Sequence, residues 1–449
     1  MKVMKFGGTS VGTTERMKGV VALITREQQK NNDNGQSNAP VVVVLSAMSG
    51  TTNSLVEISN YLYKKNSDGA NEIINSLENK YLAHIDELFA TDVIKNDMRK
   101  FIQENMDYLR SFTKDIFTSF EEKSILAQGE ILSTNMVAAY MKEQGYNVCL
   151  LSAIDFMRTD KNSEPDLNYI KEKLNAILEN QSGYDAYITQ GFICRNAYGE
   201  IDNLERGGSD YTASLIGAAI GADEIQIWTD IDGMHNNDPR FVENTEPVRQ
   251  LNFEEAAELA YFGAKILHPT CIQPAKFAGI PVRLKNTMDP DAEGSIIDNV
   301  LIRGKIKAIA AKDNITAIKI KSSRMLLATG FLRKVFEIFE SYQTPIDMIT
   351  TSEVGLSMSI DNDKHLNEIV EELKKYGSVT IDQDMCIVCI VGDLDWNNLG
   401  FEAWAMKALR NIPVRMISYG GSNYNISLLI RKADKTRALQ QLSEELFKK

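Results

Sequence analysis

The sequence predicts an α/β domain with a mainly parallel sheet, followed by two smaller α+β units. Strand-like segments alternate with helical ones over the first 300 residues, which is typical of a parallel sheet lying between helices. Two of these segments, Val41–Ser46 and Glu224–Thr229, are largely apolar, as strands covered on both faces require. After about residue 303 the pattern changes, and one arrangement of helix and strand occurs twice.

The expected domains follow from this change of pattern. The first domain spans residues 1–300, and the two smaller units span 308–385 and 386–449, leaving open whether the last residues return to the first of these units. Residues 70–120 carry few strand signals and predict a helical insertion, and the polar stretch 31–39 predicts a surface loop. The expected strands of the first domain are Val3–Phe6, Val41–Ser46, Val148–Ser152, Ala186–Gln190, Glu224–Thr229 and Val282–Lys285.

The C-terminal part contains an internal repeat. Gly330-Phe331 is followed by a helical stretch and then by the segment 345–350, and Gly400-Phe401 is followed in the same way by the segment 413–418. A strand with alternating apolar residues comes after each copy. Two occurrences in the same order predict two related β-α-β units.

Composition limits the function classes. The 449 residues exceed one ordinary core, and a net charge of −12 without a long basic run disfavours nucleic acid and anionic membranes as partners. No apolar stretch reaches the length of a membrane span, and the N-terminus lacks a signal-peptide pattern. Five scattered cysteines suggest a reducing, cytoplasmic location. Cys386 and Cys389 lie in an apolar run and point to opposite faces of a strand, so we expect a buried strand there rather than a metal site.

Three glycine-containing turns indicate phosphate chemistry. The turns at 5–10, 46–53 and 206–212 each follow a strand-like segment of the first domain and lead into a helical pattern. Glycines let the backbone approach a phosphate closely, and helix N-termini offer free N–H groups. One such turn alone is more often a plain loop, but three in one α/β domain favour a phosphate site. The P-loop, dinucleotide-binding and protein-kinase motifs are absent.

The motif Lys5-Phe6-Gly7-Gly8-Thr9-Ser10 resembles the opening signature of the aspartate kinases. The segments 128–130, 207–212, 228–230 and 262–265 resemble further motifs of that family, and Ile349-Thr350-Thr351-Ser352-Glu353 resembles the lysine-inhibited members. The resemblance covers essentially the whole chain in order and suggests a monofunctional member. It implies an amino-acid-kinase fold followed by two ferredoxin-like ACT domains.

The resemblance also implies a reaction. The family transfers the γ-phosphate of ATP, bound with Mg²⁺, to the side-chain carboxylate of L-aspartate, as the first step of lysine, threonine and methionine biosynthesis. The acceptor carboxylate is already ionised at pH 7, so positioning and charge neutralisation are needed rather than a general base. We expect Mg²⁺ to be carried by ATP, with no metal ligand from the protein.

The resemblance assigns four sets of site residues. The catalytic set is Lys5, Gly7, Gly8 and Asp210. The aspartate-binding set is Thr52, Glu130, Arg206 and Ser209. The ATP-binding set is Lys5, Thr229, Asp230, His235, Arg240 and Lys265. The allosteric set, for lysine, is Met325, Gly330, Phe331, Leu332, Asp347, Thr351, Ser352 and Glu353.

The chemistry of four side chains suits these roles. Lys5 offers a cation to the transferred phosphoryl group, and the planar fork of Arg206 suits the α-carboxylate of aspartate. Glu130 lies on an apolar helical face, where a carboxylate needs a partner, either the substrate ammonium or a structural cation. Asp210 stands at a helix start, where it either caps the helix or orients Lys5 or the metal.

Two positions depart from the family pattern, and two alternative functions remain open. His235 stands where the family commonly has Tyr, which bears on its contact with the nucleotide. Ala328 stands where lysine-sensitive members commonly have Ser, which weakens the case for lysine and leaves threonine as the alternative effector. We expect a homodimer or higher homo-oligomer, joined through the ACT domains. The alternatives are another enzyme of the same fold, such as glutamate 5-kinase, acetylglutamate kinase or uridylate kinase, and an inactive ligand sensor.

Overall fold

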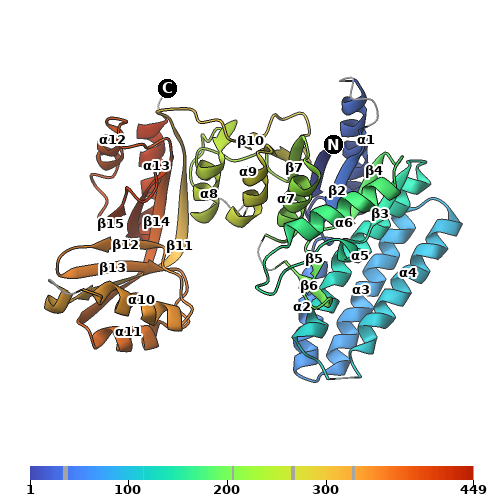
Figure 1. Cartoon of the computed structure of the whole chain (residues 1–449), viewed down its shortest axis with the longest axis horizontal. Helices are drawn as coiled ribbons and strands as arrows, with labels where there is room; N and C mark the ends of the chain where they lie inside the picture. Colours follow the sequence, from blue (N-terminus) through green and yellow to red (C-terminus); the bar gives the residue numbers. More distant parts are fainter. Residues whose placement is uncertain (34–38, 115, 205–206, 264–267, 326–328, 448–449) are drawn as a thin grey trace. The chain divides into compact units, whose positions relative to one another are not determined.

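The chain forms two compact units in the computed structural model (Figure 1), which describes residues 1–33, 39–114, 116–204, 207–263, 268–325 and 329–447. The N-terminal unit consists of Met1–Gly233 and Ile266–Asn299, and the C-terminal unit consists of Met234–Lys265 and Val300–Lys449. Residues 234–265 therefore group with the C-terminal unit, although the motif pattern placed them in a first domain of residues 1–300. The reason is that helix α8 (Phe253–Tyr261) contacts the long strands of that unit.

The N-terminal unit is built on a mainly parallel sheet. Its strands are β1 (Lys2–Phe6), β2 (Val41–Leu45), β3 (Val148–Leu151), β4 (Ala186–Gln190), β7 (Glu224–Thr229), β9 (Val282–Asn286) and β10 (Ser295–Asp298). They lie in the order β3-β4-β2-β1-β7-β9-β10. Only β10 is antiparallel to its neighbour in this series. The parallel sheet predicted from the sequence is confirmed, and β2 is buried along its whole length.

The register brings the carboxyl ends of three strands together. Phe6, at the end of β1, pairs with Leu45 of β2 on one side and with Trp228 of β7 on the other. A short hairpin of β5 (Ile193–Arg195) and β6 (Ile201–Asn203) follows β4. Ligands bind at such carboxyl ends in open parallel sheets, so this edge is where a site is expected.

Helices surround the sheet, and four of them pack on one another (Figure 1). The helices are α1 (Thr14–Asp33), α2 (Thr51–Tyr63), α3 (Ser67–Leu88), α4 (Asp92–Ser111), α5 (Ser119–Glu143), α6 (Leu167–Asn180), α7 (Gly208–Ile220) and α9 (Gln273–Ala278), with 3-10 turns at Ala153–Asp155 and Pro269–Ile272. Helices α3 and α4 fall in the stretch 70–120. Their buried residues, including Ile74, Tyr81 and Ile102, share one apolar core with β1 and β2. The helical insertion is thus packed on the sheet domain and has no separate core.

The C-terminal unit contains an antiparallel sheet with helices. Besides β8 (Gln250–Asn252) and α8, its elements are β11 (Ile306–Lys321), α10 (Phe331–Ser341), β12 (Met348–Thr351), β13 (Gly355–Ile360), α11 (Leu366–Lys374), β14 (Ser378–Gly392), α12 (Phe401–Ala408), β15 (Val414–Ser418), β16 (Asn425–Arg431) and α13 (Lys435–Leu446), with 3-10 turns at Ser323–Met325 and Lys432–Asp434. The strand order is β12-β13-β11-β14-β16-β15. Every pairing in this sheet is antiparallel.

The repeat corresponds to two structural halves with separate cores. The first core joins Ile318 of β11 with α10, β13 and α11, and the second joins Ile309 of β11 with β14, α12, β16 and α13. Helix α13 packs in the second core, so the segment that crosses between the halves is the start of β11 and not the end of the chain. The two related α+β units predicted from the repeat are confirmed.

Both long strands change direction at a residue with positive φ. Asn314 in β11 has φ 61° and Asp384 in β14 has φ 53°. The β11–β14 register shifts between Lys312 and Ile315. Asn and Asp tolerate the left-handed region better than other non-glycine residues. Each long strand is therefore two strands joined at a bulge, one for each half.

Two further expectations concern cysteines and membranes. Cys386 and Cys389 lie on β14, are both buried and are unpaired, and only Cys386 belongs to the second core. This fits a buried strand.

Within the ranges that the structure describes, no helix is both long and apolar enough to span a membrane.

Candidate active site

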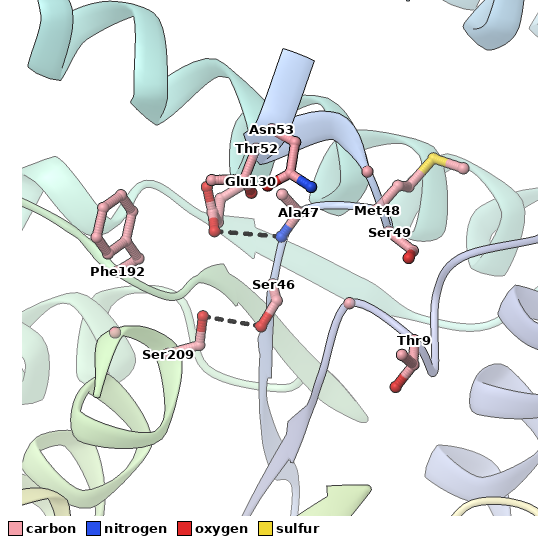
Figure 2. A pocket seen from close by; sticks show the side chains of 13 residues that line it. Thr9, Ser46, Ala47, Met48, Ser49, Thr52, Asn53, Glu130, Phe192 and Ser209 are labelled. Carbon is pink, nitrogen blue, oxygen red and sulfur yellow. Dashed lines mark hydrogen bonds between the residues drawn. The ribbon is translucent and has the colours of Figure 1, made fainter. Parts of the chain in front are cut away.

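A cavity of about 460 Å³ opens beside the ends of β1 and β2 (Figure 2). It is lined by Gly8, Thr9, Ser46, Ala47, Met48, Ser49, Gly50, Thr52, Asn53, Glu130, Phe192, Gly208 and Ser209. The lining comes from all three glycine-containing turns and from helix α5. Four of the predicted site residues, namely Gly8, Thr52, Glu130 and Ser209, are therefore brought together.

Lys5 and Asp210 form a largely buried ion pair. Lys5 Nζ lies 2.6 Å from Asp210 Oδ1, and the two side chains are 11% and 17% exposed. Asp210 stands in the first turn of α7, whose N-cap is Gly207. The carboxylate of Asp210 therefore does not serve as the cap and is directed at Lys5. An ion pair with little solvent holds the lysine ammonium in one place.

Glu130 is a buried carboxylate on α5. It is only 5% exposed, and its Oε1 accepts a hydrogen bond from the Ala47 N–H at 3.2 Å, drawn in Figure 2. Burial raises the pKa of Glu130 to about 7, against the opposing effects of the Ala47 N–H and the charge of Lys5. Among the described residues, no basic side chain lies within ion-pair distance of Glu130.

Hydroxyl groups connect the elements that line the cavity. Ser46 Oγ donates to Ser209 Oγ at 2.9 Å, which links the end of β2 with the start of α7 (Figure 2). Ser133 Oγ, on α5, donates to the Ser46 carbonyl at 2.7 Å. Thr52 lies in the first turn of α2 and is exposed. The cavity thus presents hydroxyl donors and acceptors around one buried carboxylate.

The glycines of the site are required by close contacts. A Cβ on Gly8 would lie 2.8 Å from the Ala47 carbonyl oxygen. Gly207 has φ +73°, and a Cβ there would lie 1.8 Å from Cys271 Sγ. Gly7 lies beside the ammonium group of Lys5, because a Cβ added to Gly7 would lie 3.5 Å from Lys5 Nζ. Only glycine at positions 8 and 207 permits such close approach, whereas a Cβ on Gly7 would make only an ordinary van der Waals contact.

The predicted ATP-binding residues are divided between the two units. Thr229 ends β7 in the N-terminal unit, where its carbonyl accepts a hydrogen bond from Thr287 Oγ1 at 2.8 Å, and the exposed Asp230 follows it. His235 and Arg240 belong to the C-terminal unit. His235 Nδ1 lies 2.9 Å from Thr245 Oγ1.

The Arg240 side chain is 70% exposed, and its Nη2 lies 2.6 Å from Asp238 Oδ2. Three further positions that the sequence singled out, namely Arg206, Lys265 and Ala328, lie outside the described residues. In the described part of the chain, no three His, Cys, Asp or Glu side chains are grouped closely enough to hold a metal ion.

The predicted allosteric residues lie in the first half of the C-terminal unit. Met325 ends a 3-10 turn, Gly330 caps α10, and Phe331 and Leu332 begin that helix, with Phe331 buried and Leu332 exposed. Thr351 ends β12. Ser352 and Glu353 are exposed in the turn that leads to β13.

Asp347 has partners within its own unit. Its Oδ1 lies 2.8 Å from Lys312 Nζ and accepts a hydrogen bond from Tyr261 Oη at 2.9 Å. Its side chain is 1% exposed. Burial raises the pKa of Asp347, although the ammonium of Lys312 opposes this. The Glu353 carboxylate has no ion pair among the described residues, so these two candidate acids differ in environment.

Two residues in or beside the cavity wall were not indicated by the sequence, namely Phe192 and Lys80. Ser46 and Ala47 belong to the turn 46–53, which the sequence indicated as one of three phosphate-binding turns, although neither was named individually as a site residue. Phe192 comes after β4 with φ +66°, and no pattern in the sequence indicates it. Lys80 of α3 donates to the Ser49 carbonyl at 2.8 Å, a contact that depends on how the helical insertion packs.

Comparisons with known proteins agree with this geometry. The model of the amino acid kinase family matches residues 1–286, and an ACT domain model matches residues 388–446. The fold and the cavity thus define an amino acid kinase with ACT domains. Aspartokinase 1 (chloroplastic) of Arabidopsis thaliana is 34% identical and covers 99% of this chain and 80% of its own length. The lysine-sensitive aspartokinase 3 of Escherichia coli is 31% identical over 99% of each chain.

Solved structures give the same answer. E. coli aspartokinase III in complex with aspartate and ADP (R-state) matches with a TM-score of 0.83 at 29% identity, over 100% of both chains. The same enzyme with lysine and aspartate (T-state) matches with a TM-score of 0.78 at 30% identity, also over 100% of both chains. The chain belongs to the aspartokinase family, and it is an aspartate kinase. The resemblance seen at Lys5–Ser10 is confirmed.

Proposed function

We propose that the cavity beside β1 and β2 is where the γ-phosphate of ATP passes to the β-carboxylate of L-aspartate, giving ADP and 4-phospho-L-aspartate. The observation that carries this proposal is the buried Lys5–Asp210 ion pair next to the buried carboxylate of Glu130. The related E. coli enzyme was solved with aspartate and ADP, which supports this pair of ligands.

Charge neutralisation is the main task of the site in this proposal. Lys5 stabilises the negative charge of the transferred phosphoryl group, and Asp210 keeps the ammonium of Lys5 in position. The backbone N–H groups of the turns at Gly7-Gly8 and Gly208-Ser209 offer further donors. Mg²⁺ enters with ATP as part of the substrate and neutralises its phosphates. The aspartate carboxylate attacks directly, so no side chain acts as a general base.

Recognition of aspartate uses its two backbone groups. Glu130 binds the α-ammonium, because a buried carboxylate that forms no ion pair within the described residues gains most from a charged ligand. Arg206 binds the α-carboxylate through its planar guanidinium group. Thr52 and Ser209 add hydroxyl contacts, and Thr229, Asp230, His235, Arg240 and Lys265 bind the nucleotide.

Replacing Lys5 tests the catalytic role. Lys5→Ala should lower kcat by about 10²-fold or more, on the scale of losing one electrostatic stabiliser of the transition state. Acyl phosphate formed from aspartate is trapped as the hydroxamate and measured at saturating substrates. Lys171→Ala, an exposed residue of α6, serves as the control. A Lys5→Ala enzyme within about threefold of wild type would exclude this role.

Regulation, assembly and location complete the proposal. We infer that lysine inhibits the enzyme by binding near Met325, Gly330–Leu332, Asp347 and Thr351–Glu353, since the E. coli relative is lysine-sensitive and was solved with lysine. The ACT units pair in a homodimer or a higher homo-oligomer. The enzyme acts in the cytoplasm, and its product feeds lysine, threonine and methionine biosynthesis.

A further inference from the structure

Helix α3 of the helical insertion contacts the wall of the cavity through two consecutive residues. Lys80 Nζ donates to the Ser49 carbonyl at 2.8 Å. Tyr81 Oη forms a hydrogen bond with Thr51 Oγ1 at 3.1 Å. Ser49 lines the cavity, and Thr51 immediately precedes Thr52, which also lines it. Both contacts therefore reach the turn that leads from β2 into α2.

One backbone hydrogen bond closes this turn, from the Thr51 N–H to the Met48 carbonyl at 2.9 Å. Gly50 stands at the N-cap of α2 with φ +81°, and no side chain caps the helix there. The Ser49 N–H donates to the Gly8 carbonyl at 3.1 Å. The residue Ser49 is thus held at its N–H by the first glycine turn and at its carbonyl by Lys80. Loss of the Lys80 contact would leave the Ser49 carbonyl without this partner.

The environment of Lys80 is unusual for a surface lysine. The side chain is half-buried, and burial lowers the pKa of Lys80. In the part of the chain that the structure describes, no carboxylate forms an ion pair with it. A lysine that only keeps a helix soluble would point to water or pair with an acid. Lys80 instead directs its ammonium at a backbone carbonyl of the cavity wall, where a charge-assisted hydrogen bond is strong.

Tyr81 holds the same turn from the interior. It is completely buried, and burial raises the pKa of its hydroxyl, with a further contribution from the charge of Glu130. Its partner Thr51 is also completely buried. The hydroxyl pair is therefore shielded from water. Its Thr51 lies beside helix α5, because Thr51 Cγ2 is 3.6 Å from where a Cβ on Gly129 would stand, and Gly129 directly precedes the carboxylate that binds substrate in our proposal.

We propose that Lys80 and Tyr81 are positioning residues for aspartate, because they fix the turn Met48–Thr52 that forms one wall of its pocket. The inference rests on the proposed function of the cavity and gives a role to the helical insertion. A displacement of about 1 Å in a substrate-contacting group can cost up to ~10²-fold in rate. Loosening this turn should therefore weaken the productive binding of aspartate much more than that of ATP.

The first test replaces Lys80. Lys80→Met keeps the length and apolar stem of the side chain but removes the donor, and it should raise KM for aspartate by about fivefold or more. KM for ATP should stay within about twofold. Lys80→Arg restores a charged donor and should recover most of the loss. Lys100→Met, on α4 of the same insertion with a side chain 79% exposed, is the matched control and should behave as wild type.

The second test replaces Tyr81. It tests the positioning role on its own if the Lys80→Met variant does not fold. Tyr81→Phe removes only the hydroxyl and should raise KM for aspartate by about threefold. The control is Tyr108→Phe, at an exposed tyrosine of α4, and it should leave KM for aspartate unchanged. Unfolding temperatures of all variants are measured alongside.

The outcomes separate the two levels of the proposal. A wild-type chain that does not phosphorylate aspartate contradicts the proposed function itself. An active wild type with unchanged KM for aspartate in both Lys80→Met and Tyr81→Phe overturns the positioning role. Equal rises in KM for aspartate and for ATP, together with a lowered unfolding temperature, show general destabilisation and overturn it as well.

Discussion

Glu130 is a carboxylate in surroundings that disfavour its charge. Burial raises its pKa from an ordinary value of 4.5 to about 7, and the Ala47 N–H and Lys5 only partly offset that effect. The group is therefore partly protonated near neutral pH when no ligand is bound. An amino-acid ammonium that enters the cavity would stabilise the ionised form and be bound by it in turn.

This shift predicts a pH dependence of substrate use. Only ionised Glu130 binds the α-ammonium in our proposal, so kcat/KM for aspartate should rise with pH and level off above an apparent pKa near 7. Initial rates measured from about pH 6 to about pH 8 give the profile. Glu130→Gln should lose most activity and also lose this acidic limb. A limb that persists unchanged in Glu130→Gln would assign the titration to another group.

The same shift predicts a cost in stability. The folded state holds the proton more tightly than the unfolded state, so stability is lost as pH rises from 4.5 to about 7. The cost above pH 7 is on the order of 3 kcal/mol. Glu130→Gln should therefore raise the unfolding temperature at about pH 8 but not at about pH 4. Equal changes in unfolding temperature at both pH values would contradict this explanation.

At the level of single residues, the sequence predicted the members of the cavity that lie in short motifs. Gly8, Thr52, Glu130 and Ser209 stand in motifs where a turn follows a strand or a carboxylate follows a glycine, and these signals are local. Lys80 lies in a helix with no motif, and its contact with Ser49 exists only because the insertion packs on the sheet domain. Such tertiary contacts leave no periodic trace in the sequence.

At the level of elements, the long strands β11 and β14 connect the two ACT-like halves. Strands usually have about five or six residues, so a sequence pattern would divide each of these into two. The domain boundary expected between residues 385 and 386 falls inside β14, next to Asp384 with its positive φ. The sequence pattern did not indicate that one strand continues across this position, because continuity depends on pairing with β11.

Asp384 offers a direct test of this bend. Its side chain is exposed and its φ is 53°, a region that β-branched residues avoid. Asp384→Gly should leave stability unchanged or slightly higher, whereas Asp384→Val should cost about 1–2 kcal/mol. The free energy of unfolding from denaturant titration compares the two variants. A Val variant as stable as the Gly variant would mean that the backbone there relaxes without strain.

At the level of the whole molecule, the regulation that we propose depends on which acid accepts the ammonium of the effector. Asp347 is already engaged by Lys312 and Tyr261, whereas Glu353 is exposed and forms no ion pair within the described ranges. Glu353 is therefore the carboxylate more readily available to a bound amino acid. A ligand inhibits only through a higher affinity for the less active state.

Separate titrations with lysine and threonine test this assignment. At saturating ATP and moderate aspartate, lysine should inhibit the wild type, and Glu353→Ala should weaken that inhibition by about tenfold, as expected when a charged hydrogen bond is lost. Threonine should have little effect. Inhibition by threonine alone, or lysine inhibition that the substitution leaves intact, would remove this pocket assignment.

The alternation of strands and helices was sufficient to predict the parallel sheet, because each strand and each helix is formed by a local stretch of sequence. The grouping of residues 234–265 with the C-terminal unit was not predictable in this way. It depends on contacts of α8 with β11 and β14. Both strands come much later in the chain than α8, which ends at Tyr261, since β11 begins at Ile306 and β14 at Ser378. The edges of the antiparallel sheet, β12 and β15, likewise become visible only once the strand order is known, and these two strands contact each other.

The shared strand β11 has a consequence for synthesis on the ribosome. Its first part belongs to the second core, which is completed only by α13 near residue 446, whereas the first core is built from one continuous stretch of chain. As domains begin to fold while the polypeptide emerges, the first core can close early. The segment 306–312 can meet the earlier residues Asn236 and Gln250 at once, but it gains β14, β16 and α13 only later. The second core of the nascent enzyme is thus completed only when translation is nearly finished.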